Sequence, residues 1–173
     1  MRCNCSSNFN YQVAGLCDIP DFNLDTNVNS NWTEISVPEI LTIPCAKPDI
    51  ESIDKIYINS KITTTKIIKT PTSPKDGTTL IANPEGLKLT GWKLLVEGFL
   101  CQTLVYTADE CEQSVHAAHF NMPFSTYIVL PENTTPTDKF NVRVCIEYVF
   151  AKRLTPRTIF KNVTMFLQAD KLS

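Results

Sequence analysis

The chain has 173 residues, of which 43% are hydrophobic and 20% are charged, and its formal net charge is −2. These values are typical of a single globular domain, and they exclude the strongly basic surface that nucleic-acid binding requires. No stretch reaches the roughly 18 consecutive apolar residues of a membrane-spanning helix, so we expect neither nucleic acid nor membrane as a partner.

The first 34 residues differ in character from the rest of the chain. They are rich in asparagine, poor in charge, and show neither the period of a strand nor that of a helix. They carry Cys3, Cys5 and Cys17. We therefore predict an extended amino-terminal arm over residues 1–34 and one folded domain over residues 35–173. The opening residues lack the apolar segment of a secretory signal, so we expect no export by that route.

From Ser36 onward, short β-branched runs are separated by turn residues. Residues 54–69 predict a half-buried strand whose core face carries Ile56, Ile58, Ile62 and Ile68. The following TPTSPKDGTT, residues 70–79, predicts a loop. Residues 87–107 predict one or two long strands, in which Gly91 and Gly98 mark a bulge or a close approach of two backbones.

The second half of the chain continues this pattern. Residues 108–120 are the best helix candidate, although they are short for one. Residues 122–130 alternate again. The cleanest alternation lies in residues 141–151, whose predicted core face carries Val142, Val144, Ile146, Tyr148 and Phe150. A last strand over residues 157–169 has its apolar residues at odd positions: Ile159, Val163, Met165 and Leu167. We predict an all-β fold, an antiparallel β-sandwich or jelly roll.

One group of residues has the side-chain types of a metal site: Cys101, Cys111, His116 and His119. Two histidines three positions apart can share a metal on a helix, but on a strand they face opposite sides. The gap from Cys101 to Cys111 also matches no compact zinc-finger spacing. We therefore predict no metal and no other cofactor, and we expect both histidines to be packed or hydrogen-bonded within the fold.

Catalytic signatures are missing from the sequence as well. It contains no G-x-S-x-G, no H-E-x-x-H and no glycine-rich phosphate loop, and it has five glycines in all. We predict that the protein is not an enzyme. Trp32 and Trp92 are candidates for a sugar-binding platform, which leaves a binding module as the alternative function.

The seven cysteines are an odd number, so pairing within one chain cannot use all of them. Cys45, between a proline and an alanine, fits a buried and inert thiol. Cys145 lies on the polar face of residues 141–151 and Cys111 lies in an acidic turn, so we expect both to be exposed. The candidates for disulfides between chains are Cys3, Cys5, Cys17, Cys101, Cys111 and Cys145.

Three stretches in the centre of the chain are distinctive: LTGWKLLVEG, QSVHAAHF and PFSTYIVLP. They lie within residues 85–133, which resemble the SipL/SPOCS β-domain of spore-coat and exosporium proteins of endospore-forming bacteria. IPCAKPDIESI at 43–53 and IEYVFAKRLTPRTIFKNVTMFLQA at 146–169 extend the resemblance to residues 36–170. It implies a structural protein of the spore surface, made in the mother-cell cytoplasm without a signal peptide. The resemblance implies no catalytic residues.

The predicted function combines the arm, the thiols and this resemblance. We expect a homo-oligomeric subunit of a spore coat, exosporium or appendage, in which the arm adds a strand to a neighbour and disulfides lock the contact. Such a head-to-tail contact builds a fibre or a lattice. Other spore-coat or exosporium proteins are further expected partners. The alternative is a non-catalytic module of the coat that recognises a glycan or a coat protein.

Overall fold

A computed structural model describes residues 11–17 and 31–172, which form β-strands and turns without a helix. The strands are β1 (Gln12–Ala14), β2 (Asn31–Thr42), β3 (Ile50–Thr72), β4 (Thr90–Ala108), β5 (Val115–Val129), β6 (Phe140–Arg153) and β7 (Thr158–Lys171). The predicted all-β fold is confirmed. Within these residues there is no helix of the length and apolarity needed to span a membrane.

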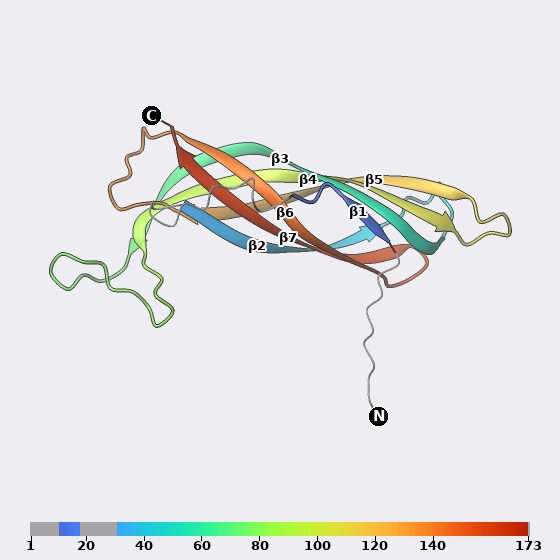
Figure 1. The fold of residues 1–173 in the computed structure, drawn as a ribbon, viewed down its shortest axis with the longest axis horizontal. Coiled ribbons are helices and arrows are strands. Elements are labelled where there is room, and N and C mark those ends of the chain that lie inside the picture. The colour runs from blue at the N-terminus through green and yellow to red at the C-terminus, as the bar shows by residue number, and fades with distance from the viewer. Residues whose placement is uncertain (1–10, 18–30, 173) are drawn as a thin grey trace, which may run out of the picture.

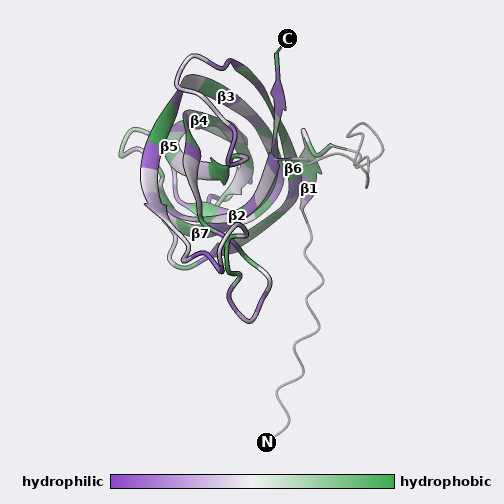
Figure 2. Ribbon diagram, turned by 90° about the vertical axis from the view of Figure 1, so that its left-hand side faces the viewer, coloured by the Kyte–Doolittle hydropathy of each residue, from purple (hydrophilic) through white to green (hydrophobic). Residues whose placement is uncertain are grey.

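The strands form two sheets, with the order β1-β3-β4-β5 in one and β2-β7-β6 in the other. Every pairing is antiparallel except that of β1 with β3, which is parallel. The long strands run along the long axis of the molecule, and the connecting loops gather at its two ends (Figure 1). Viewed along that axis, the sheets curve around a shared interior, with β1 at the side of the molecule beside β6 (Figure 2). The expected sandwich is therefore confirmed.

The core comes from alternating positions on the facing strands. In β4 the even-numbered side chains point inward, and Leu94, Val96, Leu100 and Leu104 are almost fully buried there. In β7 the odd positions do the same, as the sequence predicts for Ile159, Val163, Met165 and Leu167. Each such side chain contributes roughly 1.5–3 kcal/mol when it leaves water. This core holds the two sheets together.

In two strands, the residues that follow a β-bulge bury the opposite face from the predicted one. In β3 the register shifts between Ile62 and Thr64, and Ile67 rather than Ile68 packs against the core. In β6 the shift lies between Ile146 and Tyr148. Tyr148 is therefore 50% exposed, whereas Val149 and Ala151 are buried. One extra residue in a strand reverses the face of every residue that follows, so the simple alternation fails there.

Two predicted boundaries also differ from the structure. Residues 108–120 do not form a helix, because β4 continues to Ala108 and β5 begins at Val115 after a short turn. The boundary predicted between residues 34 and 35 falls inside β2, whose first residues pair with the end of β7. Residues 31–34 belong to the sandwich because this pairing, between distant parts of the chain, extends the sheet.

The predicted close approach at Gly98 is confirmed. A Cβ atom there would lie 2.5 Å from the carbonyl oxygen of Lys61 and 2.9 Å from the ring of Phe124. We expect Gly98→Ala to lower the free energy of unfolding by roughly 1–3 kcal/mol, because the backbone of β3 must move. Urea denaturation measures this change. The control Ser125→Ala, on the exposed side of β5, should have almost no effect, and equal stability of the two variants would contradict the expectation.

Candidate assembly site

Residues 11–17, which we call the amino-terminal clasp, lie across the side of the sandwich between β3 and β6. β1 extends the β3 edge by pairing with Lys55–Tyr57. On the other side, the Ala151 N–H donates to the Tyr11 hydroxyl (2.7 Å), which itself donates to the Val149 carbonyl (3.2 Å). The Cys17 N–H donates to the carbonyl oxygen of Ile146 at 3.1 Å. The clasp therefore satisfies polar edge groups of β6 that none of the described strands pairs.

Local sequence explains why the clasp fits this position. Tyr11 and Val13 pack against the core from the side, and partial burial raises the pKa of the Tyr11 hydroxyl, which stays protonated as a donor. Gly15 has a φ of 106°, and a Cβ there would lie 1.9 Å from the carbonyl oxygen of Ile58. Only glycine allows the chain to turn away from β3 so close to its backbone.

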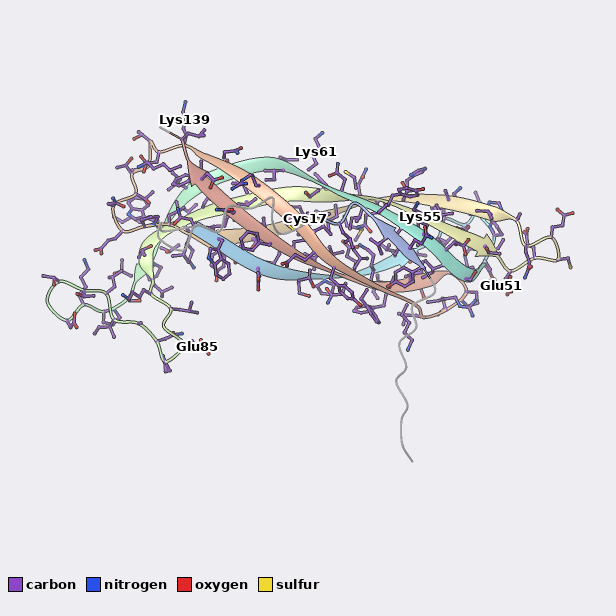
Figure 3. The ribbon with its side chains drawn as sticks, viewed as in Figure 1. Cys17, Glu51, Lys55, Lys61, Glu85 and Lys139 are labelled. Carbon is purple, nitrogen blue, oxygen red and sulfur yellow. A yellow bond between two sulfur atoms is a disulfide. The ribbon has the colours of Figure 1, made fainter. Side chains whose placement is uncertain are left out.

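A disulfide between Cys17 and Cys145 holds the clasp to β6. The two Cα atoms are 5.4 Å apart, a separation that is usual for such a bond. Cys145 is 1% exposed, because the clasp of its own chain covers this part of β6. Cys17 lies close to β6 near the middle of the molecule (Figure 3). The prediction that Cys17 and Cys145 bond to a neighbouring chain is therefore wrong, as is the expected exposure of Cys145.

The other cysteines divide into two groups. Cys3 and Cys5 lie outside the described residues. Cys45, Cys101 and Cys111 are free thiols, of which Cys45 and Cys111 are exposed and Cys101 is partly exposed. The exposure of Cys111 confirms its prediction, whereas the predicted burial of Cys45 is wrong, because Cys45 lies in the turn between β2 and β3.

Cys45 and Cys111 lie at the same end of the sandwich. Their loops, residues 43–49 and 109–114, flank the paired ends of β3 and β4, and the Asp109 N–H donates to the Asp49 carbonyl at 3.0 Å. Cys101 lies elsewhere, at the middle of β4. The structure therefore presents two separate thiol locations: one at an end of the sandwich and one on the outer face of a sheet.

Cys101 lines a groove of about 350 Å³ on that outer face. The neighbouring strands contribute Asn59 and Asn121, which are the Cα partners of Cys101 in β3 and β5. His119 closes the groove on one side, with its Nδ1 2.9 Å from the Thr103 hydroxyl, and the clasp borders it at Gly15. The groove is open and its exposed lining is more apolar than polar, and the partly exposed Cys101 thiol is among its lining residues.

His116 and His119 lie on opposite sides of a strand, as the sequence predicts if this segment is a strand and not a helix. β5 places His116 on the inner side, where its ring contacts Tyr106 and its Nε2 lies 2.9 Å from the Ser114 hydroxyl. His119 faces the groove on the opposite side. Their predicted packing and hydrogen bonding is confirmed. Over residues 11–17 and 31–172, no three metal-ligating side chains come together.

The two tryptophans do not share a surface. Trp32 lies on β2 and is half exposed, with its ring 5.7 Å from that of Phe166. Trp92 lies on β4, in the other sheet, and packs against the core. They do not form a joint sugar platform, because Trp92 packs against the core whereas Trp32 is exposed on β2.

Sequence reasoning missed a polar cluster inside the core. Glu39, Gln102 and Lys161 come from β2, β4 and β7, and each is at most 5% exposed. A Glu39 carboxylate oxygen lies 2.8 Å from the Lys161 ammonium and accepts a hydrogen bond from the Gln102 amide at 2.9 Å. Burial lowers the pKa of Lys161, and the contacts with Glu39 oppose this shift in part. The signal in the sequence was one polar residue interrupting the apolar face of each of three strands.

Comparison with known proteins identifies one family. The family model described as SipL, SPOCS domain matches residues 49–154, from β3 to the end of β6. No curated protein and no solved structure matches the chain. The match confirms the resemblance inferred from the central sequence stretches.

Proposed function

Because the chain belongs to the SipL family of SPOCS-domain proteins, we propose that it is a structural subunit of the spore surface that forms homo-oligomers through disulfides between chains. The SPOCS domain is a non-enzymatic type of domain found in sporulation proteins, so the chain is a sporulation-associated protein. The spore coat, the exosporium or an appendage is the location that we propose for it. The observation that carries the assembly proposal is the set of accessible thiols outside the Cys17–Cys145 bond.

Tyr11 in the clasp is the point from which the reach of Cys3 and Cys5 is measured. Cys3 and Cys5 precede Tyr11 by eight and six residues. Because a fully extended chain spans about 3.3–3.6 Å per residue, Cys3 can reach at most about 29 Å from Tyr11. This reach is sufficient for a neighbouring subunit. Cys101 and Cys111 are the proposed acceptor thiols, since both are accessible on the described surface.

The edge of β3 offers a second element of the proposed contact. β1 pairs with only three residues of β3, and among the described strands none pairs with this edge from Ile58 to Thr72. An unpaired edge can accept a strand from another chain. Lys61, Lys66 and Lys69 are exposed along this stretch, and Lys61 points away from the sandwich in Figure 3. Lysines on an edge limit uncontrolled pairing, so a specific partner strand is favoured.

The full chain, purified without reductant, tests this proposal. We expect covalent oligomers on non-reducing gels and ordered assemblies in electron micrographs, both of which a reductant should disperse. The double variant Cys3→Ser/Cys5→Ser should remain monomeric on the same gels. The matched control Cys45→Ser removes an exposed thiol that the proposal does not use, and it should still assemble. Monomeric wild-type protein under oxidising conditions would contradict the proposal.

The groove around Cys101 supports a second candidate function, a module that binds a glycan or a coat-protein segment. Asn59, Asn121 and His119 in its lining can form hydrogen bonds to sugar hydroxyls or to a peptide backbone, and the apolar remainder of the lining can contact a sugar ring. This candidate predicts that reductant does not change the oligomeric state. It also predicts that soluble peptidoglycan fragments shift the NMR signals of His119, and unchanged signals would argue against this ligand.

A further inference from the structure

The buried cluster of Glu39, Gln102 and Lys161 brings together an amine, a carboxylate and a carboxamide. Glu39 and Lys161 are paired neighbours on β2 and β7, whereas Gln102 reaches them from β4 in the opposite sheet. The cluster is buried, since Lys161 is 0% exposed and the other two residues are 5% exposed. Nothing in the proposed assembly uses these three side chains.

Glu39 stands between the two other groups. Its Oε2 atom contacts both the Lys161 Nζ (2.8 Å) and the Gln102 Nε2 (2.9 Å), and its Oε1 atom lies 3.2 Å from the same Gln102 nitrogen. The Gln102 carbonyl oxygen accepts no hydrogen bond from the described residues. The amine and the carboxamide are therefore held against one shared oxygen atom, which can carry a proton from one to the other.

The surroundings favour the reactive form of the amine. Burial penalises the ammonium form of Lys161, and its pKa is lowered accordingly. Transfer of a proton from Lys161 to Glu39 replaces two buried charges with two neutral groups, which relieves the cost of removing both ions from water. A neutral lysine amine is a nucleophile, whereas the ammonium is not.

We propose that Lys161 and Gln102 form an intramolecular isopeptide bond, with Glu39 as the general acid and base. Lys161 Nζ gives a proton to the Glu39 carboxylate, and the neutral nitrogen attacks the Gln102 Cδ. Glu39 then protonates the departing Gln102 nitrogen and takes the second proton from the Lys161 nitrogen. The bond from Cδ to Nε2 breaks, ammonia leaves, and Glu39 remains neutral. No oxidant or other reactant is needed.

The product is a covalent link between β4 and β7, and therefore between the two sheets. It differs from the Cys17–Cys145 bond because reductants do not break it. It concerns a single subunit, so it is independent of any assembly between chains.

Mass spectrometry of the full chain, reduced and denatured, tests the bond. We expect a mass lower than that of the unmodified sequence by one ammonia, about 17 Da, because one amine displaces another at the carboxamide carbon. Proteolysis should release a branched peptide that joins the segments around Gln102 and Lys161. An unmodified mass for the folded wild-type chain, or a loss of ammonia that maps to another residue, would overturn the proposal.

Three variants separate this chemistry from other losses of ammonia. Lys161→Arg keeps a cation but removes the nucleophile, Gln102→Leu removes the carboxamide, and Glu39→Gln removes the proton carrier. Each should have the unmodified mass for its own sequence. The exposed control Lys66→Arg should keep the loss of ammonia. Retention of the loss in Lys161→Arg would also overturn the proposal, and the wild-type measurement remains decisive if a variant fails to fold.

Discussion

Lys161→Met is expected to lower the free energy of unfolding by at least about 3 kcal/mol. The substitution keeps the length of the side chain but removes the Lys161 nitrogen, which lies 2.8 Å from Glu39 Oε2, and with it the proposed bond to Gln102. Glu39, at 2% side-chain exposure, is then a buried polar group without its partner, which costs free energy. Denaturant titration of the full chain measures the loss.

The matched control for this prediction is Lys66→Met, at an exposed position of β3. It removes the same charge without leaving a buried partner, so stability should hardly change. The triple variant Glu39→Leu/Gln102→Leu/Lys161→Met replaces the whole cluster with apolar groups and should recover much of the loss. If Lys161→Met and Lys66→Met were equally stable, the buried cluster of Glu39, Gln102 and Lys161 would not have the importance assigned to it.

Cys17→Ser is expected to lower the free energy of unfolding by about 2–5 kcal/mol. The disulfide joins residues 128 positions apart, so it restricts the unfolded chain over most of its length. Its loss also frees the clasp, whose remaining hold on β6 is a few hydrogen bonds from Tyr11 and Cys17. Denaturant titration with and without reductant measures the effect on the wild-type chain.

Reductant should destabilise the wild-type chain and should leave Cys17→Ser unaffected. The exposed thiol variant Cys45→Ser provides the control and should respond to reductant as the wild type does. A wild-type chain whose stability is insensitive to reductant would contradict the internal bond. The same titration separates this effect from assembly, because Cys3→Ser/Cys5→Ser keeps the Cys17–Cys145 bond and should unfold like the wild-type subunit.

The internal bond changes the role of the arm. The arm was predicted to leave the body as a whole, but its residues 11–17 complete the sandwich between β3 and β6. A disulfide from the arm to a neighbour would therefore have to come from Cys3 or Cys5, which precede the clasp. The proposed acceptors lie at two locations, with Cys111 exposed at one end of the sandwich and Cys101 partly exposed on a face.

Periodicity in the sequence was sufficient where the strand ladders are regular. β7 keeps an uninterrupted register with β2, and its predicted inward face is buried. It failed where a strand contains an extra residue, as at Thr63 in β3 and Glu147 in β6, which have no partner in the register. A bulge leaves no clear mark in composition, because it is a property of two strands and not of one.

The sequence by itself therefore determined the all-β class, most of the strands, the family and the surplus of cysteines, because these depend on local pattern. Tertiary structure alone decided that Cys17 bonds to Cys145, and that Glu39, Gln102 and Lys161 meet in the core. Each of these contacts joins segments that are far apart in the chain. Which residues face each other then depends on the register of whole sheets and on how the two sheets stack, which no single segment encodes.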